Sequence, residues 1–249
     1  MKEPVRIVGN YLSPYVRKVL VFLEHKNLPY EIDPIIPVFG DDRFTAASPL
    51  RLIPVLIDDQ ATLCDSSVIC QYLEERYPQP ALYPQDLVLR ARARWLEEFA
   101  DTMMGDAFVW HLFYQLTIRP SVLGQATNQE VVERARNTEI PQVLDYLEAQ
   151  VPAEGFLFGA LSIADIAIAC FFRNAGYVRY QIDAGRWPKT VAFVARMFAQ
   201  PSFAKLAVFE DKLMRTHPAK HRTALGELGA PLSRETFGTS TPQRRIRET

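Results

Sequence analysis

A serine and a proline stand together near the N-terminus, shortly after an apolar run at residues 5–8. Serine is a preferred N-cap residue and proline is preferred at the first helical position, so Ser13 and Pro14 predict the start of a helix. A helix N-terminus presents unpaired backbone N–H groups and the positive end of the helix dipole, and both stabilise an anion. The Ser13 hydroxyl therefore has two readings, as a donor that holds a thiolate or as a plain helix cap.

A second polar pair, Asp65 and Ser66, opens another predicted helix. The Ser66 N–H and hydroxyl suit a ligand carboxylate, and the Asp65 carboxylate suits a ligand ammonium. Plain capping is the alternative for this pair as well. A third position, Pro54, stands at the entrance of an apolar segment over residues 53–57, where a proline is ordinary and where most X-Pro bonds are trans.

These residues lie in an N-terminal part that we expect to be mixed α/β. Its first helix repeats apolar residues at helical spacing and leaves Arg17, Lys18 and Glu24 for solvent. The segment 34–50 is rich in proline and is predicted to be mostly loop with one helical turn. The expected elements, in the order βαβ and then ββα, are a strand at 5–8, a helix from 14 to about 26, strands at 30–33, 53–57 and 61–63, and a helix after Asp65.

Strand patterns end near residue 80, and long helical patterns follow at 87–118, 128–150, 162–179 and 188–213. We therefore expect an α/β domain over residues 1–80, a linker at 81–86 and an all-helical domain over 87–215. Residues 216–249 contain several glycines and prolines and end in arginines, which predicts a C-terminal extension with a short ordered piece and a loose end.

The charge balance limits the partners of the chain. Its 249 residues carry 28 Lys and Arg against 29 Asp and Glu, a net charge of −1, which gives no electrostatic reason to bind nucleic acid or an anionic membrane. No apolar run reaches the roughly 20 residues that span a bilayer, and no signal-peptide pattern begins the sequence. The cysteines and histidines show no spacing typical of a metal site or a disulfide framework. These features predict a cytoplasmic protein without a metal.

Four segments resemble, in order and spacing, the cytosolic glutathione transferases. Residues 13–17 resemble the serine-type active-site loop of that family, and residues 53–56 its cis-proline loop. Asp65 and Ser66 resemble the pair that holds the γ-glutamyl end of the peptide, and residues 159–165 the capping box of the helical domain. The resemblance covers residues 4–213. It implies a thioredoxin-like N-terminal domain followed by a C-terminal helical bundle domain, a cis bond before Pro54, and a homodimer.

Glutathione is an anionic tripeptide whose thiol has an ordinary pKa of about 8.5, so at neutral pH it is mostly protonated and a poor nucleophile. A hydroxyl donor at a helix N-terminus lowers that pKa by stabilising the thiolate, which fits Ser13 as the catalytic hydrogen-bond donor. The resemblance further implies that Ile53, Pro54, Asp65 and Ser66 bind glutathione. The Ile53 backbone would pair with the cysteinyl part of the ligand as an added strand does.

A second substrate needs a pocket beside the thiol. The segment 103–114 is densely apolar and most of it must form core, but methionine suits a tolerant binding surface. The candidate pocket residues are Tyr11, Tyr15, Met104 and Phe108. Tyr11 is also the second candidate for the thiol donor, because some branches of the family use a tyrosine near this point. Asp165, by contrast, belongs to an S-x-x-D capping pattern with Ser162, and we assign that pair to folding.

The chemistry that remains is activation of glutathione itself. Dithiol-exchange proteins with a similar loop carry C-P-Y-C, whereas residues 13–16 here are Ser-Pro-Tyr-Val, so the loop has no sulfur of its own. We therefore expect a glutathione S-transferase that uses glutathione as co-substrate and conjugates it to a small electrophile, as in detoxification. Two alternatives stay open, a glutathione-dependent reductase of peroxides or disulfides and a non-catalytic binding module of the same fold.

Overall fold

The computed structural model describes residues 3–242, whose contacts divide the chain into two compact units. The first unit contains residues 3–80 together with 201–242, and the second contains residues 81–200. This division differs from the expected one at its C-terminal end. The segment that begins at residue 201 packs on the α/β part of the chain, whereas the sequence pattern continued the helical domain to residue 215.

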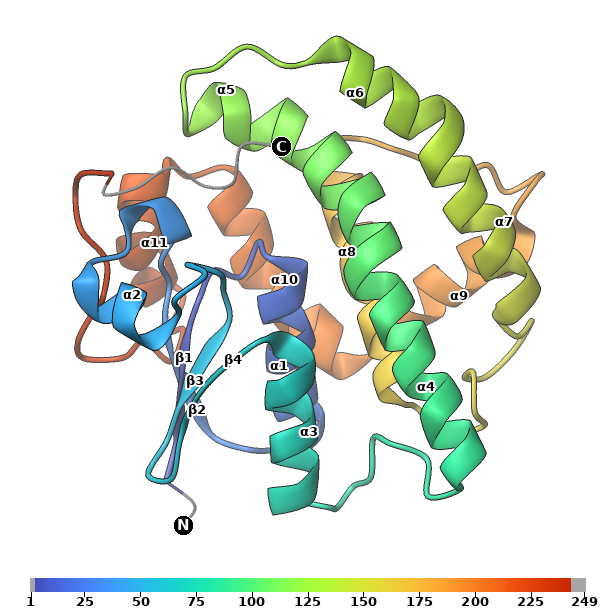
Figure 1. Ribbon diagram of the computed structural model, residues 1–249, viewed down its shortest axis with the longest axis horizontal. Helices are drawn as coiled ribbons and strands as arrows, with labels where there is room; N and C mark the ends of the chain where they lie inside the picture. Colours follow the sequence, from blue (N-terminus) through green and yellow to red (C-terminus); the bar gives the residue numbers. More distant parts are fainter. Residues whose placement is uncertain (1–2, 243–249) are drawn as a thin grey trace. The chain divides into compact units, whose positions relative to one another are not determined.

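A four-stranded sheet with strand order β2-β1-β3-β4 organises the first unit (Figure 1). β1 (Val5–Val8) pairs in parallel with β2 (Tyr30–Asp33) and antiparallel with β3 (Val55–Ile57). β3 in turn pairs antiparallel with β4 (Thr62–Cys64). The connections follow the order βαβ and ββα, which confirms the expected thioredoxin-like fold class.

Helices cover both faces of this sheet (Figure 1). α1 (Pro14–His25) and α3 (Ser66–Arg76) lie together on one face, and the short α2 (Asp42–Ala47) lies on the other side. The segment 34–50 also contains a 3-10 turn, η1 (Pro37–Phe39), so it holds slightly more helix than expected. Phe44 of α2 packs with Val8, Ile35 and Val55 in a buried apolar cluster.

α1 is buried on more sides than its apolar pattern predicts. Arg17 and Lys18, which we expect at the surface, are each only 1% exposed. The Arg17 guanidinium pairs with Glu210 of α10 (Pro201–Met214), from Nε to Oε1 at 2.5 Å. The Lys18 ammonium donates to Ser67 Oγ in α3 at 2.9 Å. The expectation was wrong because α10 and α3 cover the polar side of α1.

Two helices occupy the segment 188–213, where the sequence pattern predicts one. α9 (Pro188–Phe198) ends shortly before Pro201, and α10 begins at that proline. Proline lacks the backbone N–H that would continue the hydrogen bonds of the preceding helix. α10 packs along α1, and its Phe209 ring lies 5.1 Å from the ring of Tyr11, measured between centroids. This packing joins α10 to the first unit.

The chain after α10 stays ordered against the outer edge of the sheet. It forms η4 (Pro218–Lys220) and α11 (His221–Glu227), and then a strap, residues 231–241, which runs first beside β2 and then beside residues 39–41. The Ile32 N–H donates to the Pro231 carbonyl at 2.7 Å, and the Ser233 N–H donates back to the Ile32 carbonyl at 3.0 Å. Of the expected loose end, residues 243–249 lie outside the described part of the chain.

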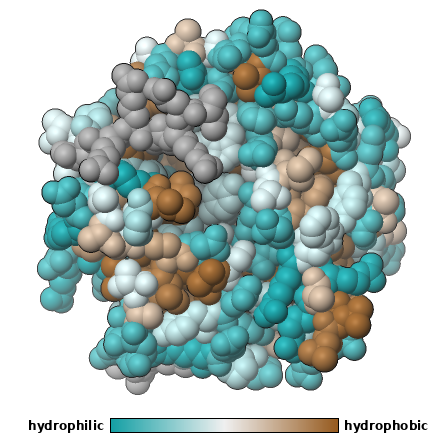
Figure 2. All heavy atoms as spheres, in the orientation of Figure 1, coloured by the Kyte–Doolittle hydropathy of each residue, from teal (hydrophilic) through white to brown (hydrophobic). Residues whose placement is uncertain are grey.

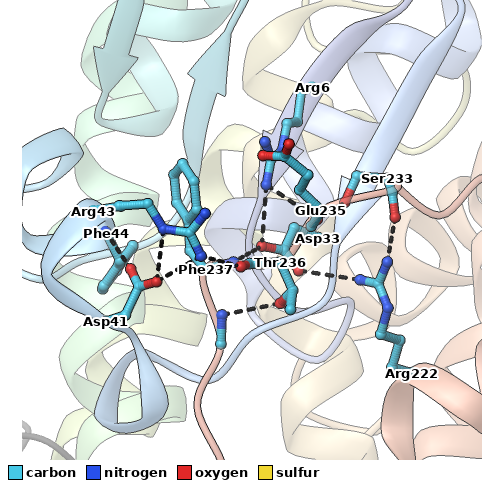
Figure 3. A network of polar contacts seen from close by, with 11 residues as sticks. Arg6, Asp33, Asp41, Arg43, Phe44, Arg222, Ser233, Glu235, Thr236 and Phe237 are labelled. Carbon is cyan, nitrogen blue, oxygen red and sulfur yellow. Dashed lines mark hydrogen bonds and ion pairs between the residues drawn. The ribbon is translucent and has the colours of Figure 1, made fainter.

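Asp33, at the end of β2, ties the strap to the sheet (Figure 3). Its carboxylate is fully buried and accepts from Arg222 Nη1 at 3.2 Å and from the Phe237 N–H at 2.6 Å. Arg6 Nη2 lies 3.5 Å from the same carboxylate. A buried charge is costly unless it is paired and hydrogen-bonded, so these partners account for an aspartate at this position.

Helices make up the second unit. One long helix consists of α4 (Leu87–Phe99), a π-helical stretch η2 (Ala100–Ile118) and α5 (Arg119–Ser121). A second consists of α6 (Gln129–Arg134), η3 (Ala135–Glu139) and α7 (Ile140–Gln150). α8 (Ile163–Tyr177) is buried along most of its length and packs against α4 and η2. Its helical architecture confirms the expected fold class of the C-terminal domain.

The predicted capping interaction stands at the start of α8. Asp165 Oδ2 accepts from the Ser162 N–H at 2.9 Å and from the Ser162 hydroxyl at 2.7 Å. Asp165 Oδ1 accepts from the Leu157 N–H at 2.9 Å, so the carboxylate also fixes the loop that enters the helix. The side chain is fully buried, and it works in folding, as the sequence pattern predicts.

Apolar side chains reach the surface in separate patches within a mostly polar exterior, on the face drawn in Figure 2. Large apolar side chains that are more than half exposed include Leu50 in the first unit and Leu87, Val88 and Trp95 in the second. Within residues 3–242, no helix combines the length and the apolar composition that a membrane crossing requires.

Candidate functional site

Three residues that pair side by side across the sheet mark the strand ends from which the predicted glutathione contacts follow. Val8 of β1 pairs with Val55 of β3, and Val55 pairs with Cys64 of β4. β1 and β4 finish at this row, while the antiparallel β3 begins there. The chain therefore leaves or enters the sheet at the same end in all three places.

Three loops that are distant in sequence consequently start from neighbouring strand ends. The turn that leads to Ser13 follows Val8, the Ile53-Pro54 dipeptide precedes Val55, and Asp65 follows Cys64. The pairing of the strands thus brings the candidate residues to the same end of the sheet. Functional sites are commonly built from such loops at the ends of strands on a rigid scaffold.

Ser13 is the N-cap residue of α1. Its extended backbone, with φ −78° and ψ 126°, lets its Oγ accept from the Val16 N–H at 3.4 Å. Pro14 is the first helical residue, which confirms the predicted helix start. A hydroxyl that accepts one hydrogen bond still has its own proton to donate. Ser13 is half-buried, so the residue is partly accessible to solvent.

Gly9 and Asn10 shape the turn between β1 and Ser13. A Cβ on Gly9 would lie 2.5 Å from Val16 Cγ2, so glycine lets this turn approach α1 closely, while Ile53 Cβ would be at an ordinary contact distance of 3.4 Å. Asn10 accepts from the Leu12 N–H through Oδ1 at 3.1 Å and from the Ser13 N–H through its carbonyl at 3.0 Å. Sequence reasoning missed Gly9 and Asn10; the glycine directly after a strand was the available signal.

The peptide bond between Ile53 and Pro54 is cis, which confirms what the family resemblance implies. Pro54 is buried and Ile53 is half-buried. Ile53 lies beside Gly9, and through it beside the turn that carries Ser13.

Asp65 caps α3 with an unusual backbone. Its φ of 73° lies in the left-handed region, which non-glycine residues seldom adopt and which recurs at ligand sites. Oδ1 accepts from the Ser67 N–H at 2.9 Å and from the Val68 N–H at 3.0 Å, while the residue remains exposed. Ser66, the first helical residue, is 2% exposed. Both readings of this pair, cap and ligand site, agree with this geometry.

Tyr11 lies inside the first unit. It is fully buried against Phe209, and burial raises the pKa of its hydroxyl far above the ordinary value of 10. The groups that act on this hydroxyl are Tyr30, Glu24 and Glu210. A hydroxyl with no exposed surface is poorly placed to meet a ligand, so the placement of Tyr11 favours Ser13 as the thiol donor.

The other residues of the predicted second-substrate pocket are spread over both units. Tyr15 is half-buried in the first turn of α1. Met104 and Phe108 belong to η2 in the second unit, and both are fully buried. Phe108 packs on Phe172, with ring centroids 5.2 Å apart. These two side chains therefore serve the helical core, and the pocket stays a prediction.

Cysteine and metal chemistry gain no support near these loops. The Cys64 thiol is half-buried and donates to the Ala47 carbonyl at 2.8 Å, which is a packing role. In the described part of the chain, no three His, Cys, Asp or Glu side chains are grouped so that they could hold a metal ion.

Both halves of the chain match domains of the same protein family. The family model described as "Glutathione S-transferase, N-terminal domain" matches residues 8–81, and the one described as "Glutathione S-transferase, C-terminal domain" matches residues 99–201. The chain is 29% identical over 206 residues to "Uncharacterized GST-like protein YibF" of Escherichia coli K12, across 81% of this chain and 97% of that protein. It is 30% identical over 210 residues to glutathione S-transferase 3 of Zea mays, across 81% of this chain and 92% of the relative.

A solved structure adds a ligand to this comparison. A glutathione S-transferase from Methylobacterium radiotolerans, in complex with glutathione sulfonate, is 26% identical to this chain. It superposes with a TM-score of 0.68, over 82% of this chain and 94% of that one.

Proposed function

This chain belongs to the glutathione S-transferase family, and from that premise we propose that it binds glutathione, stabilises the thiolate and conjugates the whole peptide, through its sulfur, to a small electrophile. Glutathione is the substrate that gives the family its name, and the related structure that holds glutathione sulfonate supports it as the ligand here. The proposal assigns each step of binding and activation to a residue at the end of the sheet.

Ser13 is the thiolate donor in this proposal. Its hydroxyl stands at the N-cap of α1, where the free backbone N–H groups and the helix dipole add to the attraction for a negative sulfur. A hydrogen bond to a charged group stabilises it by about 1.5–3 kcal/mol, which corresponds to a fall of about 1–2 pH units in the thiol pKa. That fall raises the ionised fraction of the thiol at neutral pH from a few per cent to between about one quarter and about three quarters.

The remaining contacts hold the peptide. We assign the ligand ammonium to Asp65 Oδ2, since both backbone bonds of this carboxylate go to Oδ1. The γ-glutamyl carboxylate goes to the N-terminus of α3 at Ser66. The backbone of Ile53, next to Pro54, pairs with the cysteinyl part of the ligand as an added strand would.

One observation carries this proposal, the row Val8, Val55 and Cys64 across the sheet. It brings a helix N-cap hydroxyl, a backbone edge and an acidic helix cap to the same end, which are the groups that a thiol-bearing, zwitterionic peptide needs. Each of these three motifs alone can be explained as a helix cap or a strand entrance. Helix capping and strand entry do not explain why all three lie at the same end of the sheet.

The proposal is tested with Ser13→Ala in three measurements: calorimetric titration with glutathione, titration of the bound thiolate by its ultraviolet absorbance, and conjugation of a generic aryl halide. We expect the thiol pKa to rise by about 1–2 pH units and conjugation to fall about 10²-fold, while glutathione still binds. Asn128→Ala is the matched control, because Asn128 caps α6 in the second unit by accepting from Val131 N–H at 3.3 Å.

The alternatives give different results in the same assays. A wild-type chain that fails to bind millimolar glutathione would support the non-catalytic module. Consumption of a peroxide with formation of glutathione disulfide, but of no thioether, would support the reductase. An unchanged thiol pKa in Ser13→Ala would remove Ser13 from the mechanism and move the test to Tyr11.

The electrophile site and the assembly state extend the proposal. We assign the electrophile to the neighbourhood of Ser13 and Tyr15 in the first unit, since Tyr11, Met104 and Phe108, the other residues predicted for this pocket, are fully buried. The homodimer is proposed from the family, and Leu50, an apolar side chain that is 80% exposed, is a candidate for its interface. Light scattering coupled to size-exclusion chromatography tests it, with Leu50→Glu expected to shift the mass from dimer toward monomer.

A further inference from the structure

His221 is buried between the C-terminal helices and the turn that follows β1. It is the first residue of α11 and is 4% exposed. Its Nε2 lies 3.0 Å from the Thr216 carbonyl oxygen, and its Nδ1 lies 3.3 Å from Asn10 Nδ2. A carbonyl oxygen can only accept a hydrogen bond, so Nε2 carries the ring proton and Nδ1 accepts from the Asn10 amide.

Asn10 connects this contact to the turn that holds Ser13. Its Oδ1 accepts from the Leu12 N–H at 3.1 Å, and its carbonyl accepts from the Ser13 N–H at 3.0 Å. Only one orientation of the side-chain amide satisfies both neighbours, with the NH2 group toward His221 and the oxygen toward Leu12. The imidazole therefore fixes the amide, and the amide fixes the backbone just before the N-cap.

The next residue, Arg222, reaches the same turn by a second route. Its guanidinium donates to Asp33 Oδ1 at 3.2 Å (Figure 3). The Asp33 carbonyl accepts from the Gly9 N–H at 3.0 Å. α11 thus holds both ends of residues 9–10, one through Asp33 and the other through Asn10.

We propose that His221 is a positioning residue for the glutathione site, acting through Asn10 on the turn at Leu12 and Ser13. This inference rests on the proposed function and extends it to a C-terminal helix that the glutathione-binding motifs do not include. His221 does not touch the ligand. It holds the turn so that the Ser13 hydroxyl and the first N–H groups of α1 face the sulfur.

Two substitutions separate this role from packing. His221→Asn puts an amide oxygen near the position of Nδ1, so it keeps the acceptor for Asn10 and loses the donor to Thr216. His221→Gln puts an amide nitrogen near the position of Nε2, so it keeps the donor to Thr216 and loses the acceptor for Asn10. Both variants lose the ring, so a merely structural role predicts similar effects from the two.

Amide hydrogen exchange at Leu12 and Ser13 measures the turn without any ligand. We expect exchange to become about tenfold faster in His221→Gln and to stay near the wild-type rate in His221→Asn. In the presence of glutathione, His221→Gln should also raise the pKa of the bound thiol, and His221→Asn should leave it close to the wild-type value.

Asn10→Ala removes the same hydrogen bond by deleting its donor instead of its acceptor. This variant still tests the inference if His221→Gln folds poorly. In an Asn10→Ala background, exchange at Leu12 should no longer depend on residue 221. Equal exchange in His221→Asn and His221→Gln, or unchanged exchange in Asn10→Ala, would overturn the inference. Failure of the wild-type chain to bind glutathione would refute the proposed function alone, because the exchange measurement needs no ligand.

Discussion

Arg17 and Glu210 form an ion pair inside the first unit, with Nε and Oε1 2.5 Å apart and neither side chain more than 2% exposed. Arg17 also donates to the Tyr11 carbonyl at 3.3 Å, so the pair joins α1, the turn before Ser13 and α10. A buried pair adds little net stability compared with an apolar pair, but removing one partner leaves an uncompensated charge. A substitution that removes one partner is therefore expected to lower the stability of the first unit.

We predict that Glu210→Ala destabilises the first unit by about 3–5 kcal/mol, because the Arg17 guanidinium stays buried without its carboxylate. Hydrogen exchange of α1 and α10 amides during a urea series measures this loss. Val208→Ala is the control, since Val208 lies on the same helix and is 57% exposed. Similar losses in the two variants would mean that the ion pair does not hold α10 on α1.

A second prediction concerns the strap. Asp33→Asn keeps the shape of the side chain but removes the charge that pairs with Arg222 and lies near Arg6. The strap should then open more often, and proteolysis within residues 231–241 should accelerate by at least about tenfold, because cleavage follows the population of the open form. Limited digestion read by mass spectrometry gives the rate.

Glu31→Gln serves as the control for the strap, because it removes a half-buried carboxylate from the same strand, β2. Equal cleavage of the two variants would show that the hydrogen bonds between β2 and the strap suffice without the Asp33 charge.

The parts of the fold that depend on local sequence could be predicted, and those that depend on distant contacts could not. The helix start at Ser13, the cap at Asp65 and the box at Asp165 each lie within four residues of the groups that they bond. The burial of Arg17 depends on a residue 193 positions away, and the contact between Asn10 and His221 spans 211 positions. Periodicity within α1 could not reveal that a C-terminal helix covers its polar side.

The strap shows the same limit from another direction. Its one proline, Pro231, and its one glycine, Gly238, are typical of loops, and the segment does form little regular structure of its own. Its order comes from hydrogen bonds to β2 and from the buried Asp33, and composition carries no information on such partners. Low helix or strand propensity was therefore a poor guide to whether the segment is held in place.

A third prediction concerns pH. Burial is the largest cause that lowers the pKa of His221 below its ordinary 6.5, and the nearby His217 lowers it further, while the Thr216 and Leu213 carbonyls oppose this. The Asn10 amide also faces the ring with a donor, which disfavours a second proton. The unfolded chain therefore binds a proton at pH values where the folded chain does not.

This contribution to stability is complete above about pH 6.5 and is lost as pH falls through the folded pKa of His221. His221→Asn removes the titrating group, so its urea midpoint should fall less than that of the wild type between about pH 7 and about pH 5. His25, whose pKa burial also lowers, remains in both chains and contributes the same slope to each. Parallel profiles for the two chains would assign the pH dependence to other groups.

The last prediction isolates the second unit. Asp165 accepts three hydrogen bonds, and Asp165→Ala leaves the two buried donors of Ser162 and the half-buried Leu157 N–H without this acceptor. We expect a loss of about 2 kcal/mol or more, since both a helix cap and a buried polar cluster are broken. The three tryptophans of the chain all belong to residues 81–200, so urea unfolding followed by tryptophan fluorescence reports on this unit alone. Asp106→Ala, an exposed carboxylate of the same unit, should leave the midpoint unchanged, and an equal shift in both variants would contradict the assignment of Asp165 to the fold.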